Sequence, residues 1–171
     1  MKIKITFVLV VLTTTTLFAQ QNGGFSKGDK LLNIGIGVNS FYDGGIPIGA
    51  SFEKGITNNI SVGVNADYLS SDYASLKFTA IYFGVRASYH VNDLLKIESK
   101  KIDVYGGPTL GYRSFSWKDT NQNLGDNYGS GLFLGVYVGG RYYLNDKIGL
   151  FAEAGSIGST NARIGVAFKF K

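Results

Sequence analysis

Hydrophobic and polar residues alternate along much of the chain, and the alternation is most regular between residues 132 and 156. In residues 132–144, one set of alternate positions is mostly leucine, valine and tyrosine, while the other holds glycine, aromatic residues and Arg141. Residues 148–155 repeat the division, with Glu153 on the second face. Because successive side chains of a strand point to opposite faces, the pattern predicts a β-hairpin with one apolar face and one face that carries charge.

The turn of this hairpin decides how the two faces meet. A three-residue loop pairs Leu144 with Ile148 and keeps the faces aligned, whereas a two-residue turn would set apolar residues opposite charged ones. The three-residue loop places Gly139 opposite Glu153 and makes Arg141 its diagonal neighbour, at about 7 to 8 Å between backbones. Two long side chains can close that distance, so we predict an Arg141–Glu153 ion pair on the polar face.

The same period of two predicts six further strands. They cover residues 31–39, 46–53, 60–68, 76–91, 102–112 and 162–170. Most are close to the 9 to 11 residues of a tilted transmembrane strand, and their apolar faces contain no charged residue or histidine. Pro108 lies within the fifth strand and has no N–H to donate, so a bulge or an irregular bond is expected there.

Composition helps to choose between the β folds that such strands can form. A soluble sandwich or calyx would hide the aliphatic face around a ligand cavity and leave glycine, asparagine and serine outside. The chain has 24 glycines, many of them on the polar face of strands, and the interior of an eight-stranded barrel is just wide enough for its own side chains. We therefore predict an all-β protein, an eight-stranded antiparallel up-and-down transmembrane β-barrel with a polar, filled lumen.

Aromatic residues near the strand ends predict two girdles at the membrane surfaces. The girdles would consist of Phe52, Tyr89, Tyr142, Phe168 and Phe170 at one rim and of Tyr42, Tyr68, Tyr73, Tyr112 and Trp117 at the other.

The start of the chain has the features of a secretory signal peptide. Lys2 and Lys4 precede an apolar run from residue 5 to residue 12, and a threonine-rich stretch leads to Ala19. The run is too short for a membrane-spanning helix, which needs about 20 apolar residues. We predict that residues 1–19 are a signal peptide cleaved after Ala19, and that residues 20–171 form one β-barrel domain.

Charged residues on the polar face are the main candidates for function. They project into the predicted lumen and roughly balance in charge; the set consists of Glu53, Asp67, Arg86, Asp103, Arg141, Glu153, Arg163 and Lys169. One interpretation is a plug of mutual ion pairs, and the other is a selectivity lining for a narrow pore. The small bore of an eight-stranded barrel favours the plug.

Candidate chemistry beyond this network is sparse. The chain has no cysteine and a single histidine, His90, so a thiolate or multi-histidine metal site is not expected and a Ser-His dyad would have to use His90. Asp119, Asn121 and Asn123 imitate the start of a calcium loop, but Leu124 stands where that loop needs glycine. The sequence thus predicts no catalytic residue, cofactor or metal site, and its net charge of +5 is too small to indicate nucleic acid.

Several segments give the chain a resemblance to a known family. They are Tyr89-His90 at the end of the fourth strand and residues 105–112 (YGGPTLGY), 140–145 (GRYYLN), 151–153 (FAE) and 165–170 (GVAFKF). Together with the signal peptide and the eight strands, they make the chain resemble the small outer-membrane β-barrel proteins, the OmpX-type and OmpA-like barrels also called the porin family. The resemblance implies the outer membrane of a Gram-negative cell, contact with outer-membrane lipids and the assembly machinery, and a monomer.

The resemblance implies a fold and no substrate. The expected function is non-enzymatic, in envelope integrity or surface interaction, with a narrow porin for small solutes as the alternative and an outer-membrane lipid-modifying enzyme as a third possibility. With a periplasmic N-terminus, the exposed loops would lie near residues 40–45, 70–75, 116–130 and 157–160. His90 would then lie at the periplasmic end of its strand, away from the outer leaflet where the lipid-modifying enzymes of this fold act. No surface partner can be named from the sequence.

Overall fold

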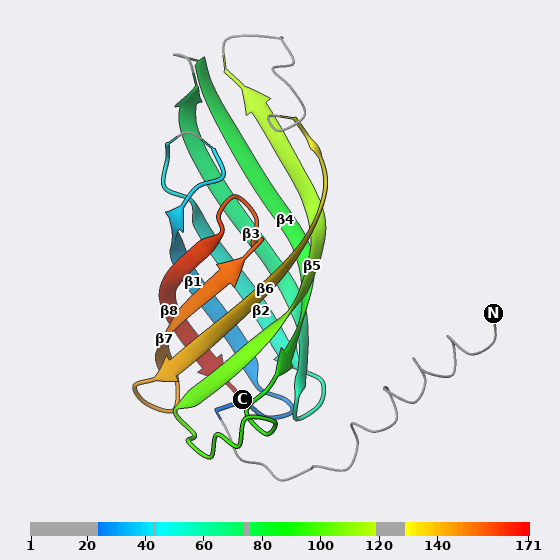
Figure 1. Ribbon diagram of the computed structural model, residues 1–171, viewed down its shortest axis with the longest axis vertical. Coiled ribbons are helices and arrows are strands. Elements are labelled where there is room, and N and C mark those ends of the chain that lie inside the picture. Colours follow the sequence, from blue (N-terminus) through cyan, green and yellow to red (C-terminus); the bar gives the residue numbers. More distant parts are fainter. Residues whose placement is uncertain (1–23, 43, 74–75, 119–128) are drawn as a thin grey trace, which may run out of the picture.

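The computed structural model describes residues 24–42, 44–73, 76–118 and 129–171, which form a closed barrel of eight antiparallel strands (Figure 1). Each strand pairs with the next in the chain and β1 pairs with β8, which confirms the predicted up-and-down barrel. The strands are β1 (Lys30–Asn39), β2 (Ile48–Gly55), β3 (Ile60–Tyr73), β4 (Leu76–His90), β5 (Ile102–Trp117), β6 (Gly131–Tyr143), β7 (Ile148–Gly155) and β8 (Ala162–Phe170). Within the described ranges, no helix is long and apolar enough to cross a membrane.

The strands differ in length, which makes one rim of the barrel oblique. β3, β4 and β5 have 14, 15 and 16 residues, whereas β2 and β7 have eight each. The three long strands project beyond the others at the end of the barrel that carries the connections 40–47 and 156–161, here called the loop end (Figure 1). The opposite end, with the connections 56–59, 92–101 and 144–147, is called the turn end. The sequence pattern ended β5 at Tyr112, and the strand continues to Trp117.

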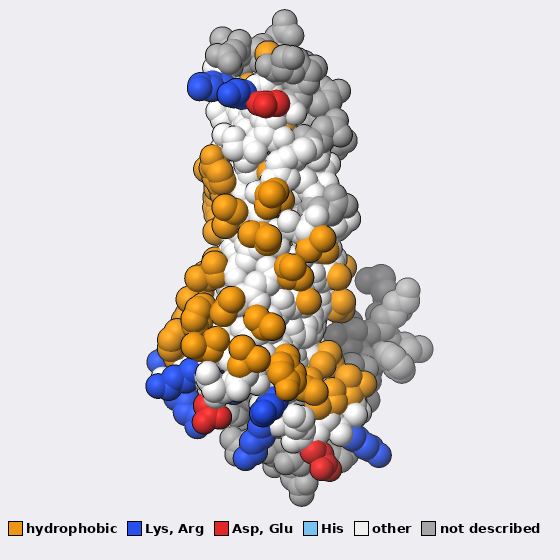
Figure 2. Space-filling model, turned by 90° about the vertical axis from the view of Figure 1, so that its left-hand side faces the viewer, with side chains coloured by type: hydrophobic (Ala, Val, Ile, Leu, Met, Phe, Trp, Pro, Cys, Tyr) orange, Lys and Arg blue, Asp and Glu red, His pale blue; other side chains and the backbone are white. Residues whose placement is uncertain are grey.

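The outer wall of the barrel carries the apolar face of the strands. All eight strands expose large hydrophobic side chains on this wall. Figure 2 shows one face of the resulting belt, with charged side chains above and below it. The most exposed members lie on β6, where Leu132 presents 82% and Val136 presents 68% of its surface. The inward positions hold buried polar and aromatic residues instead. This distribution is the reverse of that in a water-soluble protein and is what the hydrocarbon core of a bilayer requires.

The hairpin of β6 and β7 has the register that was predicted from its turn. Gly139 pairs with Glu153 across β6 and β7, and the amide of Leu144 donates to the carbonyl of Ile148 at 2.9 Å. At Pro108 the ladder between β4 and β5 is interrupted but its register does not change, so the expected irregular bond occurs without a bulge. The register shift of the barrel lies instead between β1 and β8, near Gly37.

Two glycines at the closing seam make room for an aromatic side chain in the lumen. Gly35 on β1 pairs with Gly165 on β8. A methyl group added to either residue would come within 2.8 Å of the ring of Phe151, which is itself buried. The seam therefore closes tightly only because both positions lack a side chain.

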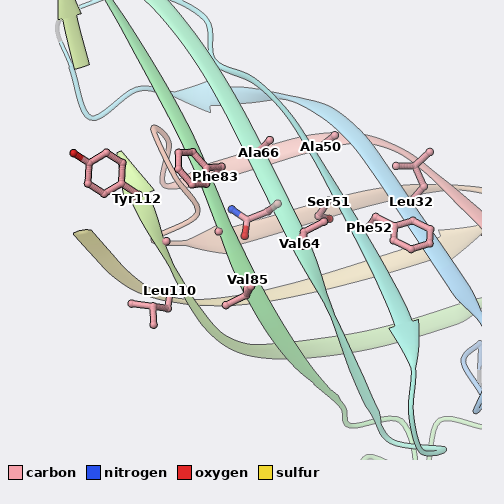
Figure 3. A pocket seen from close by; sticks show the side chains of 13 residues that line it. Leu32, Ala50, Ser51, Phe52, Val64, Ala66, Phe83, Val85, Leu110 and Tyr112 are labelled. Atoms are coloured by element: carbon pink, nitrogen blue, oxygen red, sulfur yellow. The ribbon is translucent and has the colours of Figure 1, made fainter. Parts of the chain in front are cut away.

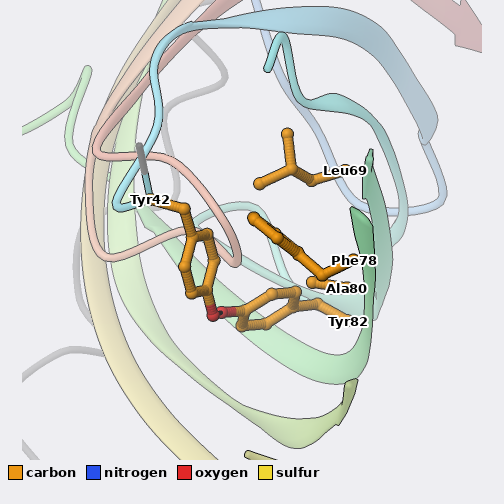
Figure 4. Packing of buried hydrophobic residues seen from close by; sticks show 5 residues of the cluster. All are labelled: Tyr42, Leu69, Phe78, Ala80 and Tyr82. Carbon is orange, nitrogen blue, oxygen red and sulfur yellow. Dashed lines mark hydrogen bonds between the residues drawn. The ribbon is translucent and has the colours of Figure 1, made fainter. Parts of the chain in front are cut away.

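A cluster of hydrophobic side chains fills the lumen at the loop end. Figure 4 shows its buried members, Tyr42, Leu69, Phe78, Ala80 and Tyr82, pointing toward one another from the 40–47 connection, β3 and β4. Partly buried residues packed against it are Phe115, Trp117 and Phe133.

This cluster corrects part of the predicted aromatic girdle. Tyr42 and Trp117 were expected at the membrane surface, but both pack inside the barrel. Tyr68 and Tyr112 do face outward, with 49% and 39% of their surfaces exposed. The reason is that β3–β5 continue past the apolar belt, so that their outer face there becomes polar, as at Ser116, and their inner face becomes apolar.

The connection between β7 and β8 folds into the lumen, contrary to the expectation of an exposed loop at 157–160. Ile157 is 2% exposed and packs against Tyr105 and Tyr137, while Ser159 and Thr160 are fully buried. Gly158 adopts a φ of +92°, which allows the chain to turn sharply in this confined space. Small polar residues are typical of exposed loops, but they are also the residues that fit inside a narrow barrel.

Candidate functional site

Of the eight charged residues assigned to the lumen from sequence, Lys169 is partly exposed at the turn end. The other seven lie in the interior, and none of them presents more than 4% of its surface to solvent. Each comes from a different strand, and β1 contributes none of them: Glu53 lies on β2, Asp67 on β3, Arg86 on β4, Asp103 on β5, Arg141 on β6, Glu153 on β7 and Arg163 on β8. Such a set can be buried only if its members neutralise one another.

Five of these residues form one continuous chain of ion pairs. Glu153 contacts Arg86 at 2.7 Å, and Arg86 contacts Glu53 at 3.4 Å. Glu53 also contacts Arg141 at 3.2 Å, and Arg141 contacts Asp103 at 2.8 Å. The chain thus alternates in sign and crosses the lumen from β7 to β5. A separate pair joins Arg163 to Asp67.

The predicted ion pair between Arg141 and Glu153 is not formed. These diagonal neighbours are linked through Asn33 of β1: Arg141 Nε donates to Asn33 Oδ1 at 3.0 Å, and Asn33 Nδ2 donates to Glu153 Oε1 at 3.4 Å. Glu153 instead pairs with Arg86 of β4, a strand that is not a neighbour of β7 in the sheet. Because the lumen is narrow, strands that are not neighbours in the sheet bring side chains as close together as strands that are.

Two tyrosines, which sequence reasoning assigned no part in the network, hold its arginines. The guanidinium of Arg86 lies 3.9 Å above the ring of Tyr137, and that of Arg141 lies 3.8 Å above the ring of Tyr105. Tyr105 also donates its hydroxyl to Glu153 at 3.0 Å. The two cation–π contacts hold the guanidinium groups against tyrosine rings, and the hydrogen bond joins Tyr105 to the carboxylate of the network.

His90 extends the network toward the turn end. Its Nδ1 lies 2.6 Å from Asp103 Oδ1, and its Nε2 lies 3.0 Å from Ser61 Oγ. This is the order of groups in a Ser-His-Asp triad, which the spacing of the three residues in sequence did not reveal. Ser61 is fully buried, however, and its Oγ also lies 2.7 Å from a carboxylate oxygen of Glu53. The serine is therefore a bridge between His90 and the ion-pair chain, enclosed on all sides by protein.

The chain preceding β1 closes the lumen over His90. The ring of Phe25 stacks on the imidazole with 3.4 Å between centroids and an interplanar angle of 3°. The segment is fixed by backbone bonds from Gly24 to Ile102 and from Gly28 to Gly55, each at 3.0 Å. Phe25 is 7% exposed, so this N-terminal segment acts as a cap on the turn end.

No group of three or more metal-binding side chains that could hold an ion occurs in the described part of the chain. The calcium-like residues Asp119, Asn121 and Asn123 lie outside the described residues.

The outer wall carries a shallow apolar groove of about 650 Å³ that spans β1 to β5 (Figure 3). Ala50 and Ala66, which pair across β2 and β3, lie beside the larger Phe52 and Phe83. All four side chains lie on the apolar outer face, whereas Ser51 and Asn65, which also line the groove, are buried.

An apolar outer wall around a lumen filled with paired charges defines a class: a transmembrane β-barrel with a packed interior. Similarity to known proteins is found at the level of structure. No protein-family model matches the chain, and no curated protein matches its sequence.

Three solved structures illustrate the similarity, and in each the match spans nearly the whole of the other chain. The outer membrane protein OprG from Pseudomonas aeruginosa has a TM-score of 0.54 and 13% identity, over 88% of this chain and 98% of that one. Neisserial surface protein A (NspA) has a TM-score of 0.53 and 20% identity, over 86% and 98%. Ail, the attachment invasion locus protein of Yersinia pestis, has a TM-score of 0.51 and 14% identity, over 84% and 99%. The fold is that of the small eight-stranded outer-membrane barrels, as the sequence resemblance implied.

Proposed function

We propose that the protein is a non-enzymatic outer-membrane barrel with a role in envelope integrity or surface interaction, and that its lumen is plugged. The observation that carries the proposal is the closure of the lumen at three levels. The inward-folded 156–161 connection and the hydrophobic cluster around Leu69 fill the loop end. The ion-pair chain fills the middle, and Phe25 covers the turn end. An interior in which every charge already has a partner offers no lining for passing ions.

Three further points support the location and the class of role. The apolar belt suits a bilayer, and the predicted signal peptide over residues 1–19 would direct the chain out of the cytoplasm. Structures that share the fold are described as outer-membrane or surface proteins, and Ail as an attachment and invasion protein. In the same proposal the barrel is a monomer, is surrounded by outer-membrane lipids and is inserted by the outer-membrane assembly machinery.

The plug is tested by conductance across a planar bilayer. Wild-type protein should show little or no steady current after insertion, whereas Glu153→Ala, which leaves Arg86 with one carboxylate fewer, should open more often. Glu98→Ala is the matched control, because Glu98 lies on the exposed 92–101 connection. Steady wild-type current with an ion selectivity that changes in Arg141→Gln would replace this proposal with the narrow porin.

A non-enzymatic role is tested separately, because the Ser61-His90-Asp103 arrangement is a chemical grouping that could argue against it. Lipid A and phospholipids from cells that express the wild type should have the same mass spectra as those from cells that express Ser61→Ala. A lipid species present with the wild type and absent with the variant would identify the protein as a lipid-modifying enzyme.

A further inference from the structure

A vestibule of about 980 Å³ opens at the turn end, outside the capped lumen. Four parts of the chain surround it: the N-terminal segment 24–29, the residues before β5, the turn between β6 and β7, and the end of β8. Lysine is the most frequent residue of its walls, which contain Lys100, Lys101, Lys147, Lys169 and Lys171 against the two acidic residues Asp29 and Asp146. Figure 2 shows lysine and arginine side chains gathered at this end of the barrel, below the apolar belt.

A buried polar atom in the wall is a second sign of a ligand. Tyr143 lines the vestibule and is 1% exposed, and its hydroxyl has no hydrogen-bond partner among the described residues. The ammonium of Lys169 lies 4.2 Å above the ring of Tyr143 and donates to the carbonyl of Gly24 at 2.9 Å, which holds it at the edge of the cavity. Buried hydroxyls are normally satisfied, so the unpaired hydroxyl of a tyrosine whose ring carries this ammonium leaves a donor for an acceptor that the described residues do not supply.

The position of the vestibule indicates the form of that anion. Phe170 belongs to its wall and is also 47% exposed on the outer face of β8, so the cavity reaches the edge of the apolar belt. Ile148 and Leu144, which are exposed on the same rim, continue the belt beside it. A ligand with an anionic head and a hydrocarbon tail would meet lysines and apolar side chains at once, whereas a free anion would use only the lysines.

We propose that the vestibule binds the phosphate-bearing headgroup of an anionic phospholipid from the leaflet at the turn end. In this proposal Lys100 and Lys147, which both line the vestibule, supply positive charge to the phosphate, the Tyr143 hydroxyl donates to one of its oxygens, and an acyl chain runs along Phe170. The inference deepens the proposed membrane role and rests on it, because it names a lipid that would surround the barrel. It does not require the lumen to be closed.

The test is lipid retention measured by native mass spectrometry. Full-length mature protein is folded in zwitterionic detergent and offered phosphatidylglycerol, phosphatidylcholine with the same acyl chains, or inorganic phosphate. Wild type should retain phosphatidylglycerol over phosphatidylcholine by about tenfold or more, since each lysine near an anionic lipid strengthens binding severalfold. The double variant Lys100→Gln/Lys147→Gln should lose that preference, because exposed lysines at these positions contribute charge rather than packing.

A matched double variant controls for net charge. Lys77→Gln/Lys118→Gln removes the same charge at the loop end and should bind phosphatidylglycerol as the wild type does. Tyr143→Phe tests the hydroxyl alone and should weaken phosphatidylglycerol retention severalfold without changing phosphatidylcholine retention. Unboiled samples of every variant should migrate as folded barrels on a gel, which verifies folding before lipid is added.

Several outcomes would overturn the proposal. They are equal retention of the two lipids by the wild type, equal loss in both double variants, or binding of inorganic phosphate without any preference for phosphatidylglycerol. Failure of the membrane role itself would look different, because the protein would then show no folded, heat-modifiable form in detergent. A barrel that conducts steadily but retains phosphatidylglycerol would refute the plug and leave the vestibule site standing.

Discussion

Glu153→Gln is the substitution that tests the central ion-pair chain most directly. Glu153 is 3% exposed and accepts hydrogen bonds from Arg86 at 2.7 Å and from Tyr105 at 3.0 Å. Glutamine keeps the shape of the side chain and removes its charge, so Arg86 is left with Glu53 alone, at 3.4 Å. Removing one partner of a buried pair costs about 3 to 5 kcal/mol. Because a second carboxylate remains, we expect the lower end, about 3 kcal/mol.

The assay is urea unfolding of the barrel in detergent or liposomes, followed by the loss of the fast-migrating folded band. Glu153→Gln should lower the unfolding midpoint, whereas Glu98→Gln, on the exposed 92–101 connection, should leave it unchanged. A double-mutant cycle with Arg86→Gln isolates the pair, and the double variant should be more stable than the sum of the two single losses predicts. Equal midpoints for Glu153→Gln and Glu98→Gln would refute the idea that buried charge pairing stabilises the barrel.

Four other predictions concern the closed barrel, the wall, the cap and the loop end. The closed barrel should be heat-modifiable, so identical mobility of boiled and unboiled samples would argue against it. Val136→Arg should cost about 2 to 4 kcal/mol near the bilayer midplane, while Thr79→Arg, on the polar outer face of β4, should cost little; equal urea midpoints would mean that the belt is misplaced. Phe25→Ala removes a stacked pair worth about 0.5 to 1.5 kcal/mol beyond its buried area, and unchanged protease resistance of the N-terminal segment would contradict the cap over His90. Leu69→Ala should cost about 2 to 5 kcal/mol in the same unfolding assay, since Leu69 is fully buried in the hydrophobic cluster at the loop end. An unchanged midpoint would show that the cluster is loosely packed.

Features set by neighbouring strands could be predicted from sequence. The pairing of Gly139 with Glu153 follows from the period of two and the length of one turn, because both act within a single hairpin. The inward direction of Arg86 and Asp103 follows in the same way from the parity of their strands. These predictions needed no knowledge of how the barrel closes.

Features set by closure could not be predicted. Arg86 and Glu153 lie on β4 and β7, which share no ladder, so their contact depends on the tilt and bore of the finished barrel. The same holds for Asn33 of β1, which bridges Arg141 and Glu153. The sequence showed only that each of these residues is polar and points into the lumen, and this does not specify which residue it contacts.

The predictions for the loops and the strand ends were wrong for a different reason. At the loop end the same types of residue occur on the inner surface of the barrel and on the surface that is exposed to solvent, so residue type does not distinguish the two. Ser159 and Thr160 are typical of an exposed loop but are buried in the lumen, because Gly158 and the short β7 and β8 bring the chain inward. Once β3–β5 pass the apolar belt, alternation alone no longer tells which face meets solvent.

The interior position of Trp117 decides what its fluorescence can report. Trp117 is the single tryptophan of the chain, and its ring centroid lies 5.6 Å from that of Phe78 and 5.4 Å from that of Phe115. Its emission should therefore follow the packing of the loop-end cluster and be insensitive to brominated lipids, which quench tryptophans that touch acyl chains. An optical folding experiment on the wild type would thus time the closure of the loop end, and a tryptophan introduced at Leu134 on the outer wall would be needed to time entry into the membrane.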